Sequence, residues 1–150
     1  MLPIATELDN CIQQYLPGLQ ALPEKEMSYK PNPAKWSKKE IIGHLVDSAQ
    51  TNIRRFVVAQ YEDNPSFRYD QDKWVVISGY QQANTAELIN LWYLLNKHFA
   101  SIIKNTVPAM AERTSTTSEV HTIEWLAVDY IKHLRHHVHQ VLELEPVAYP

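Results

Sequence analysis

Apolar residues recur at helical spacing through four long segments of the chain. Intervals of three and four residues predict amphipathic helices rather than strands. The predicted helices run from about Ala5 to Leu19, from Ser37 to about Gln60, from Asn84 or Thr85 to about Asn105, and from Thr122 to about Leu144. The sequence has only three glycines, which also favours an all-α fold. We therefore expect a four-helix bundle.

Residues that cap helix ends support these boundaries. Ser37 and Glu40 are spaced as a capping box at the start of the second helix. Thr122 can cap the fourth helix, and Pro146 follows its expected end. Residues 61–83 form a long irregular connection with room for one turn of helix, and a polar stretch, 112–118, precedes the fourth helix.

Length, charge and cysteine content restrict the class of protein. The 150 residues fit one domain, 1–150, and the net charge of -3 comes from scattered charged residues. This pattern argues against nucleic acid or an anionic membrane as partner, and the partner that we expect is a small-molecule substrate. Cys11 is the one cysteine, so an intramolecular disulfide is excluded and a reducing compartment is favoured. With neither a leader nor a membrane-spanning segment in the sequence, we expect a soluble, cytoplasmic protein.

Four histidines lie within seven residues of the last predicted helix, and its register divides them into two pairs. His133 and His137 share the apolar stripe with Leu126, Tyr130, Val141 and Leu144. His136 and His139 share the polar face with Asp129, Lys132 and Glu143. The inner pair is one helical turn apart, which places two imidazoles close enough to bind one metal ion.

The second helix offers a third ligand for this metal site. His44 lies within an apolar pattern between Ile41 and Leu45. Two histidines from one helix and one from a facing helix leave coordination positions open, as in catalytic metal sites. A zincin of the HExxH type is excluded because Leu134 stands where the general-base Glu would be. The alternative is that these histidines are interior residues with hydrogen-bond partners, or part of a histidine-rich surface helix, with no metal.

Two segments resemble the signatures of a known family. Residues 36–48, WSKKEIIGHLVDS, followed by Asn52, Arg55 and Phe56, resemble the N-terminal signature of the DinB-like superfamily. Residues 133–137, HLRHH, resemble its second signature. The nearest branch is the YfiT-like, or bacillithiol-transferase-like, proteins, and the likeness extends from Trp36 to about Leu142.

The resemblance implies an antiparallel four-helix bundle with a divalent metal, nickel or zinc in relatives, bound by His44, His133 and His137. It also makes a homodimer reasonable. Members of the superfamily include thiol-dependent S-transferases and isomerases, proteins described as metal-dependent hydrolases, and proteins of no known activity. Because fold does not fix the reaction, several functions stay open.

We favour a thiol-dependent S-transferase, in which the metal activates a low-molecular-weight thiol of the bacillithiol type for attack on an electrophile. The alternative is a metal-dependent hydrolase that uses metal-bound hydroxide on an amide or ester. A second alternative is a non-catalytic module that binds a ligand or a partner.

Four further residues are candidates for the site, each with an ordinary structural alternative. Asp47 is a candidate base or a partner that orients the first histidine, and otherwise a common helix residue. Arg55 is a candidate for binding an anionic group of the thiol, and otherwise forms a surface ion pair. Trp74, with Tyr69, can form an aromatic lid or anchor the loop. Tyr130 can donate a hydrogen bond to substrate or fill the core.

Overall fold

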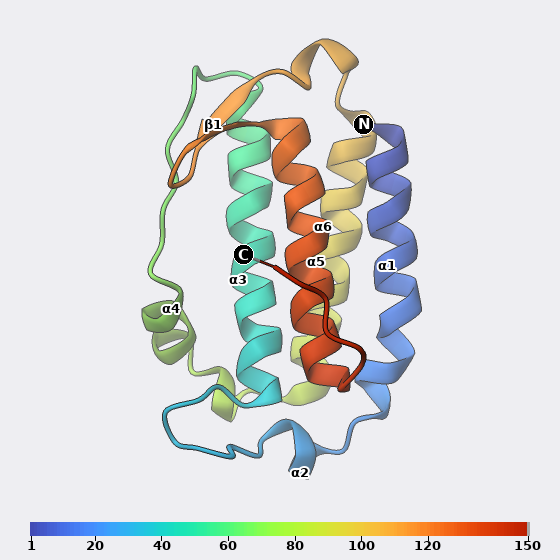
Figure 1. The fold of residues 1–150 in the computed structure, drawn as a ribbon, viewed down its shortest axis with the longest axis vertical. Helices are drawn as coiled ribbons and strands as arrows, with labels where there is room; N and C mark the ends of the chain where they lie inside the picture. The colour runs from blue at the N-terminus through green and yellow to red at the C-terminus, as the bar shows by residue number, and fades with distance from the viewer. Residues whose placement is uncertain (150) are drawn as a thin grey trace.

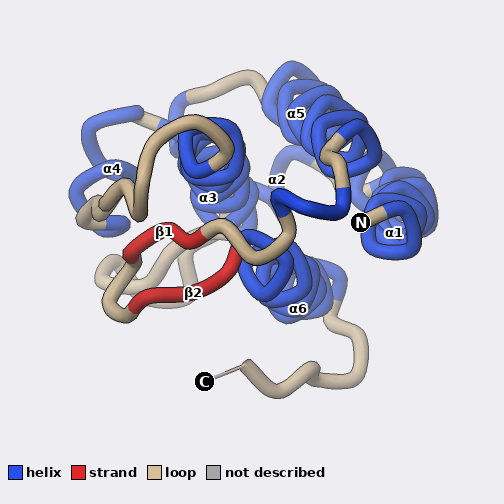
Figure 2. Tube along the Cα trace, turned by 90° about the horizontal axis from the view of Figure 1, so that it is seen from above, coloured by secondary structure: helices blue, strands red, loops and turns tan. Residues whose placement is uncertain are grey.

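The computed structural model describes residues 1–149 and consists mainly of four long helices. They are α1 (Leu2–Ala21), α3 (Lys38–Ala59), α5 (Thr85–Asn105) and α6 (Ile123–Leu142). α1 packs against α5 and α6, and α3 packs against the same two helices, so that all four surround one core (Figures 1 and 2). The four-helix bundle predicted from the apolar spacing is confirmed.

Two of the four neighbouring helix pairs are antiparallel and two are parallel. α3 is antiparallel to α6, and α1 to α5, whereas α3 and α5 run in the same direction, as do α1 and α6 (Figure 1). The long connection, 60–84, returns the chain to the end of the bundle at which α3 began, and α5 therefore starts beside the start of α3. The antiparallel arrangement holds for the pair of helices that carries the three histidines.

Short elements occupy the connections. They are α2 (Glu24–Met27), α4 (Gln71–Ser78), the 3-10 helices η1 (Tyr80–Gln82) and η2 (Pro108–Met110), and the strands β1 (Thr114–Thr116) and β2 (Val120–Thr122). α4 is the turn of helix expected within the long connection. The antiparallel hairpin of β1 and β2 departs from the all-helical expectation. It is held by the loop after α3, because the Ser115 hydroxyl and the Thr116 amide donate to the Pro65 carbonyl at 2.8 and 2.9 Å.

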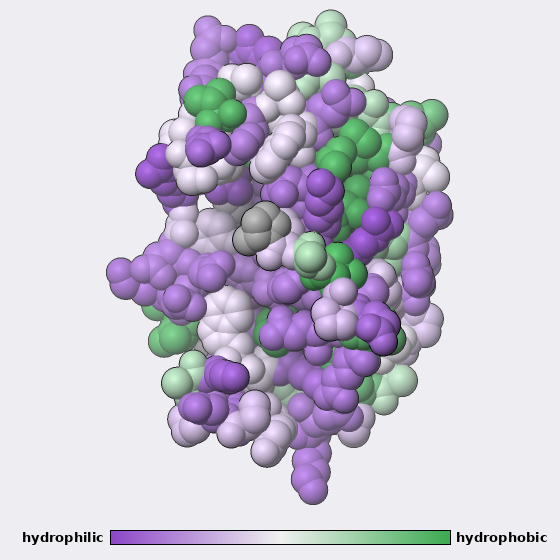
Figure 3. All heavy atoms as spheres, viewed as in Figure 1, coloured by the Kyte–Doolittle hydropathy of each residue, from purple (hydrophilic) through white to green (hydrophobic). Residues whose placement is uncertain are grey.

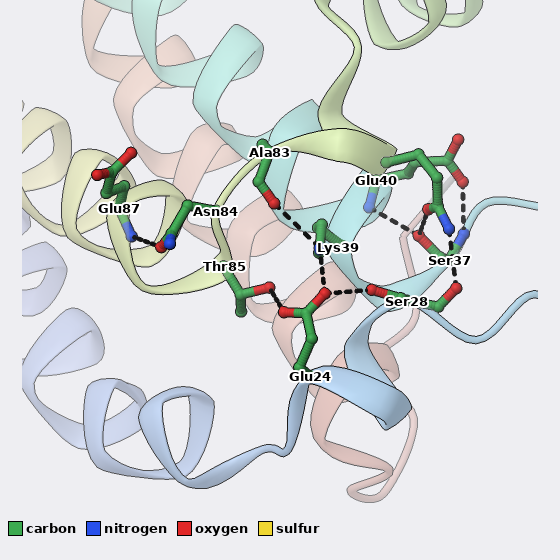
Figure 4. A network of polar contacts seen from close by, with 10 residues as sticks. Glu24, Ser28, Ser37, Lys39, Glu40, Ala83, Asn84, Thr85 and Glu87 are labelled. Atoms are coloured by element: carbon green, nitrogen blue, oxygen red, sulfur yellow. Dashed lines mark hydrogen bonds and ion pairs between the residues drawn. The ribbon is translucent and has the colours of Figure 1, made fainter.

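Polar contacts fix the end of the bundle at which α3 begins (Figure 4). The predicted capping box is present: the Glu40 amide donates to the Ser37 hydroxyl at 3.1 Å, and the Ser37 amide donates to the Glu40 carboxylate at 2.7 Å. The ammonium of Lys39, whose side chain is almost fully buried, donates to the Glu24 carboxylate at 2.5 Å and to the Ala83 carbonyl at 3.0 Å. These contacts join α2, α3 and the start of α5.

The core contains an aromatic cluster from three helices. Phe56, Phe99 and Tyr130 are buried, and successive rings meet edge to face at centroid distances of 5.5 and 5.0 Å. The outer surface over α3 and α6 is mainly hydrophilic (Figure 3). Within residues 1–149, none of the helices combines the length and apolar character needed to cross a membrane.

Candidate metal centre

The structure brings three histidines from two facing helices together. His44 lies on α3, and His133 and His137 lie one turn apart on α6. Each residue offers one ring nitrogen, and these three nitrogens lie within 4.8 Å of one another. The Nε2 atoms of His44 and His133 are 3.1 Å apart. This is the same set that helical register and the family resemblance predict as metal ligands.

The geometry and protonation of this cluster fit a divalent metal. Two nitrogens that bind one ion at about 2.0–2.1 Å lie about 2.9–3.4 Å apart for angles of roughly 90–110°. The separation of 3.1 Å between the Nε2 atoms of His44 and His133 is within that range. Burial lowers the pKa of His44 to about 4 and that of His133 to about 2, and it also lowers the pKa of His137. All three rings are therefore neutral near pH 7, which is the form that binds metal.

Neighbouring polar side chains orient two of the rings. With the Nδ1 proton on each ring, His133 donates to the Ser48 hydroxyl at 3.4 Å, and His137 donates to the Gln140 side-chain oxygen at 3.2 Å. Both contacts leave Nε2 free to bind a metal, as partners outside the ligand set commonly do. The sequence analysis missed Ser48 and Gln140, although each lies one turn from a predicted ligand on the same helix.

His44 is held differently from the other two ligands. Its ring is 2% exposed and packs against Trp36, with the centroids 5.1 Å apart. Its buried Nδ1 has no hydrogen-bond partner among residues 1–149. Contacts with Trp36 and with the other two histidine rings therefore hold this ring, in place of a hydrogen bond to its Nδ1.

His136 and His139, the two histidines of α6 that are not candidate ligands, bind the segment that follows α6. The left-handed backbone at Glu143 turns the chain back along the helix (Figure 1). The Nδ1 atom of His136 then donates to the Val147 carbonyl at 2.6 Å, and that of His139 donates to the Glu145 carbonyl at 2.7 Å. The prediction of a solvated face for these histidines was therefore wrong, because both are half-buried beneath residues 143–149.

A cavity of about 300 Å³ adjoins the three-histidine cluster. Its wall consists mainly of residues of α3 and α6, His44 and His133 among them, and the connection after α3, the hairpin and Tyr149 supply the rest. Most of the lining is polar or aromatic, including Ser48, Asn52, Tyr69, Gln71, Thr117, Ser118, His121, Trp125 and Tyr149. A small polar molecule bound here would lie directly beside the metal ligands.

Two of the four further candidates are buried near the cluster but turn their polar groups elsewhere. Asp47 is 1% exposed and is absent from the cavity lining, and its carboxylate accepts a hydrogen bond from the Tyr80 hydroxyl at 2.5 Å. Tyr130 contributes to the lining, but its hydroxyl donates to the side-chain oxygen of Asn96 at 2.6 Å. In this arrangement the Asp47 carboxylate and the Tyr130 hydroxyl are each bound to another side chain and are not directed at a ligand in the cavity.

Arg55 lines the cavity, whereas Trp74 does not. Arg55 donates to the Phe67 carbonyl from Nε at 3.1 Å and from Nη2 at 2.6 Å. It belongs to none of the ion pairs within residues 1–149, so the expected surface ion pair is not present. Trp74 is 39% exposed and packs on Tyr69, with the ring centroids 5.0 Å apart, and it therefore supports the cavity wall from outside.

Comparison with known proteins identifies the family. The model of the DinB superfamily matches residues 7–141, and the chain belongs to that superfamily. Among curated relatives, a protein from Bacillus mycoides is 23% identical over 92% of this chain and 81% of its own length. YfiT from Bacillus subtilis is 24% identical over 73% of this chain and 64% of its own length. Both carry the provisional name metal-dependent hydrolase.

The fold is that of the YfiT-like proteins. A solved structure of YfiT from Bacillus subtilis superimposes with a TM-score of 0.84 over 94% of this chain and 83% of the YfiT chain, at 18% sequence identity. It is described as a four-helix bundle of unusual topology.

Proposed function

We propose that this protein is a metal-dependent enzyme in which His44, His133 and His137 hold a divalent zinc or nickel ion beside the cavity. The convergence of three neutral imidazoles, two of which line the cavity, is the observation that carries this proposal. Three protein ligands leave coordination positions for a reactant, as in catalytic rather than structural zinc sites. The names of the YfiT-like relatives agree with a metal-dependent enzyme.

More specifically, we propose a thiol-dependent S-transferase that uses a low-molecular-weight thiol of the bacillithiol type. A divalent cation, when bound, lowers the pKa of a thiol or water that reaches it. The protein supplies the polar cavity that positions the co-substrate, and Arg55 offers a guanidinium without a carboxylate partner for an anionic group on it. The sulfur then forms a bond to the electrophilic carbon, the leaving group departs with the electron pair, and the thiol proton passes to solvent.

The first experiment measures the metal. Protein purified without a histidine tag is expected to bind about one equivalent of zinc or nickel, and His44→Ala, His133→Ala and His137→Ala are each expected to lose most of it. His136→Ala is the matched control, because His136 lies on the same helix but binds the Val147 carbonyl. Loss of metal in His136→Ala together with full binding in His137→Ala would refute the ligand assignment.

A second experiment separates the transferase from a hydrolase, which the names of the relatives favour. The metal-loaded protein is incubated with a reporter electrophile and a panel of thiols, and then with ester and amide substrates. Conjugation that depends on the identity of the thiol supports the transferase. Hydrolysis at the same rate with and without thiol supports the hydrolase instead.

A further inference from the structure

Two side chains of opposite charge line the cavity without pairing with each other. Arg55 comes from α3 and Asp129 from α6, and both contribute to the wall that also contains His133. Within residues 1–149, none of the ion pairs includes either side chain. A positive and a negative group therefore face the same small space, and each is available to a ligand.

The hydrogen-bond partners of Arg55 are all neutral. The guanidinium donates twice to the Phe67 carbonyl and, at 3.4 Å, to the side-chain oxygen of Asn52. Burial lowers the pKa of Arg55, because its charge is partly removed from water without a nearby anion to compensate. A ligand carboxylate or phosphate would supply that anion through charge-assisted hydrogen bonds.

Asp129 has one hydrogen-bond partner among the described residues. The Tyr149 hydroxyl donates to Oδ2 of its carboxylate at 2.8 Å, which leaves Oδ1 without a partner in residues 1–149. Tyr149 also packs edge to face on His133, with the ring centroids 5.2 Å apart. The contact between His136 and the Val147 carbonyl holds the segment that carries Tyr149. Asp129 is thus fixed close to the metal ligands, with acceptor capacity remaining.

We propose that the cavity selects a small molecule carrying both an anionic group and a protonated amine, with the anionic group bound by Arg55 and the amine by Asp129. A ligand with both charges pairs with both side chains at once, whereas a ligand with a single charge leaves either Arg55 or Asp129 without a partner of opposite charge. The inference rests on the proposed function in one respect: the sulfur of this molecule reaches the three histidines, so that the co-substrate is an amino-acid-like thiol.

Three thiols that differ by single groups test this selectivity. Free cysteine carries an amine and a carboxylate, cysteamine lacks the carboxylate, and 3-mercaptopropionate lacks the amine. Each is titrated into metal-free protein, and binding is followed by the NMR shift of the Trp125 indole, which lines the cavity. Cysteine is expected to bind about tenfold or more tightly than either analogue, because each charge-assisted contact contributes at least that factor.

Charge-removing variants assign each preference to one side chain. Asp129→Asn is expected to remove the preference for cysteine over 3-mercaptopropionate, and Arg55→Gln the preference for cysteine over cysteamine. Unchanged cysteamine binding by Arg55→Gln would show that the cavity is intact, and Arg55→Lys is expected to retain part of the preference. Arg54→Gln and Glu124→Gln are matched controls, because both residues are exposed and lie outside the cavity lining.

The outcomes separate this inference from the proposed function. Three results would overturn the inference. They are no binding of cysteine, equal binding of the three thiols, and unchanged selectivity in both Asp129→Asn and Arg55→Gln. The titrations are then repeated with zinc-loaded protein, and the zinc content is checked after each. Tighter thiol binding with zinc supports the proposed function. Equal thiol affinity with and without zinc counts against the proposed function. The charge selectivity measured in metal-free protein does not depend on that result.

Discussion

Replacement of Gly43 by alanine tests how the Tyr80 ring is held against α3, next to the first metal ligand. A Cβ atom built at Gly43 would lie 2.1 and 2.2 Å from two carbons of the Tyr80 ring and 2.8 Å from its Cβ. Carbon atoms in favourable contact are about 3.5–4.0 Å apart, so the ring must move by roughly 1.5 Å. That movement breaks the hydrogen bond of 2.5 Å from the Tyr80 hydroxyl to the buried carboxylate of Asp47.

The expected cost of Gly43→Ala is about 2–5 kcal/mol in the free energy of unfolding. Overpacking in a filled core costs about 1–3 kcal/mol. Loss of a hydrogen bond to a charged group costs about 1.5–3 kcal/mol, and Asp47 already has one buried oxygen without a partner in the described chain. The higher helix propensity of alanine relative to glycine offsets about 1 kcal/mol of this loss. Urea denaturation followed by circular dichroism measures the difference.

A matched control and a double variant make this reasoning refutable. At Gly18 the built Cβ approaches only the flexible end of Leu142, at 3.3 Å, so Gly18→Ala is expected to change stability by less than about 1 kcal/mol. In a Tyr80→Gly background both the ring and the Cβ that clash are removed, and Gly43→Ala is then expected to be neutral or stabilising. If Gly43→Ala costs as much in that background as in the wild type, the contact with Tyr80 is not the reason.

Three further predictions concern the core, the metal and acid stability. Tyr130→Phe leaves the buried side-chain oxygen of Asn96 without its donor, and we expect a loss of about 1–3 kcal/mol in urea denaturation with thiol conjugation unchanged. Zinc at a hundredfold excess over its dissociation constant should raise the unfolding free energy by about 2.7 kcal/mol in wild type and by nearly nothing in His137→Ala. The pKa of Glu24 is lowered from 4.5 to about 2 by hydrogen bonds from the Lys39 ammonium and from the Ser28 and Thr85 hydroxyls. The ionised Glu24 carboxylate therefore stabilises the fold above pH 4.5, and this contribution is lost as the pH falls towards 2. Acid titration of Glu24→Gln should therefore show a smaller loss of stability over that interval, and an identical loss would contradict the role of Glu24.

Contacts between residues close together in the sequence were predicted, whereas contacts between distant segments were missed. The capping box of Ser37 and Glu40 follows from spacings within one turn of helix, and so does the placement of His133 and His137 on one face. Hydrogen bonds within a helix and the apolar stripe are local properties, so the sequence shows them directly. His44 could be added because it shares an apolar pattern in a second helix.

Partners from distant segments could not be predicted in this way. Asp47 was predicted as a candidate base, but its carboxylate accepts a hydrogen bond from the Tyr80 hydroxyl and lies outside the cavity lining. Tyr149 reaches Asp129 because the segment after α6 folds back, and Ser115 joins its hairpin to the Pro65 carbonyl.

The sequence alone determined the four helices and the spacing of three histidines on inward faces, because periodicity within each helix specifies which side chains are buried together. Only the tertiary structure decided which polar groups surround those histidines. Helices that are each locally stable can be joined and packed in more than one way. The packing of α3 against α6, together with the long connection before α5, the hairpin and residues 143–149, forms the cavity.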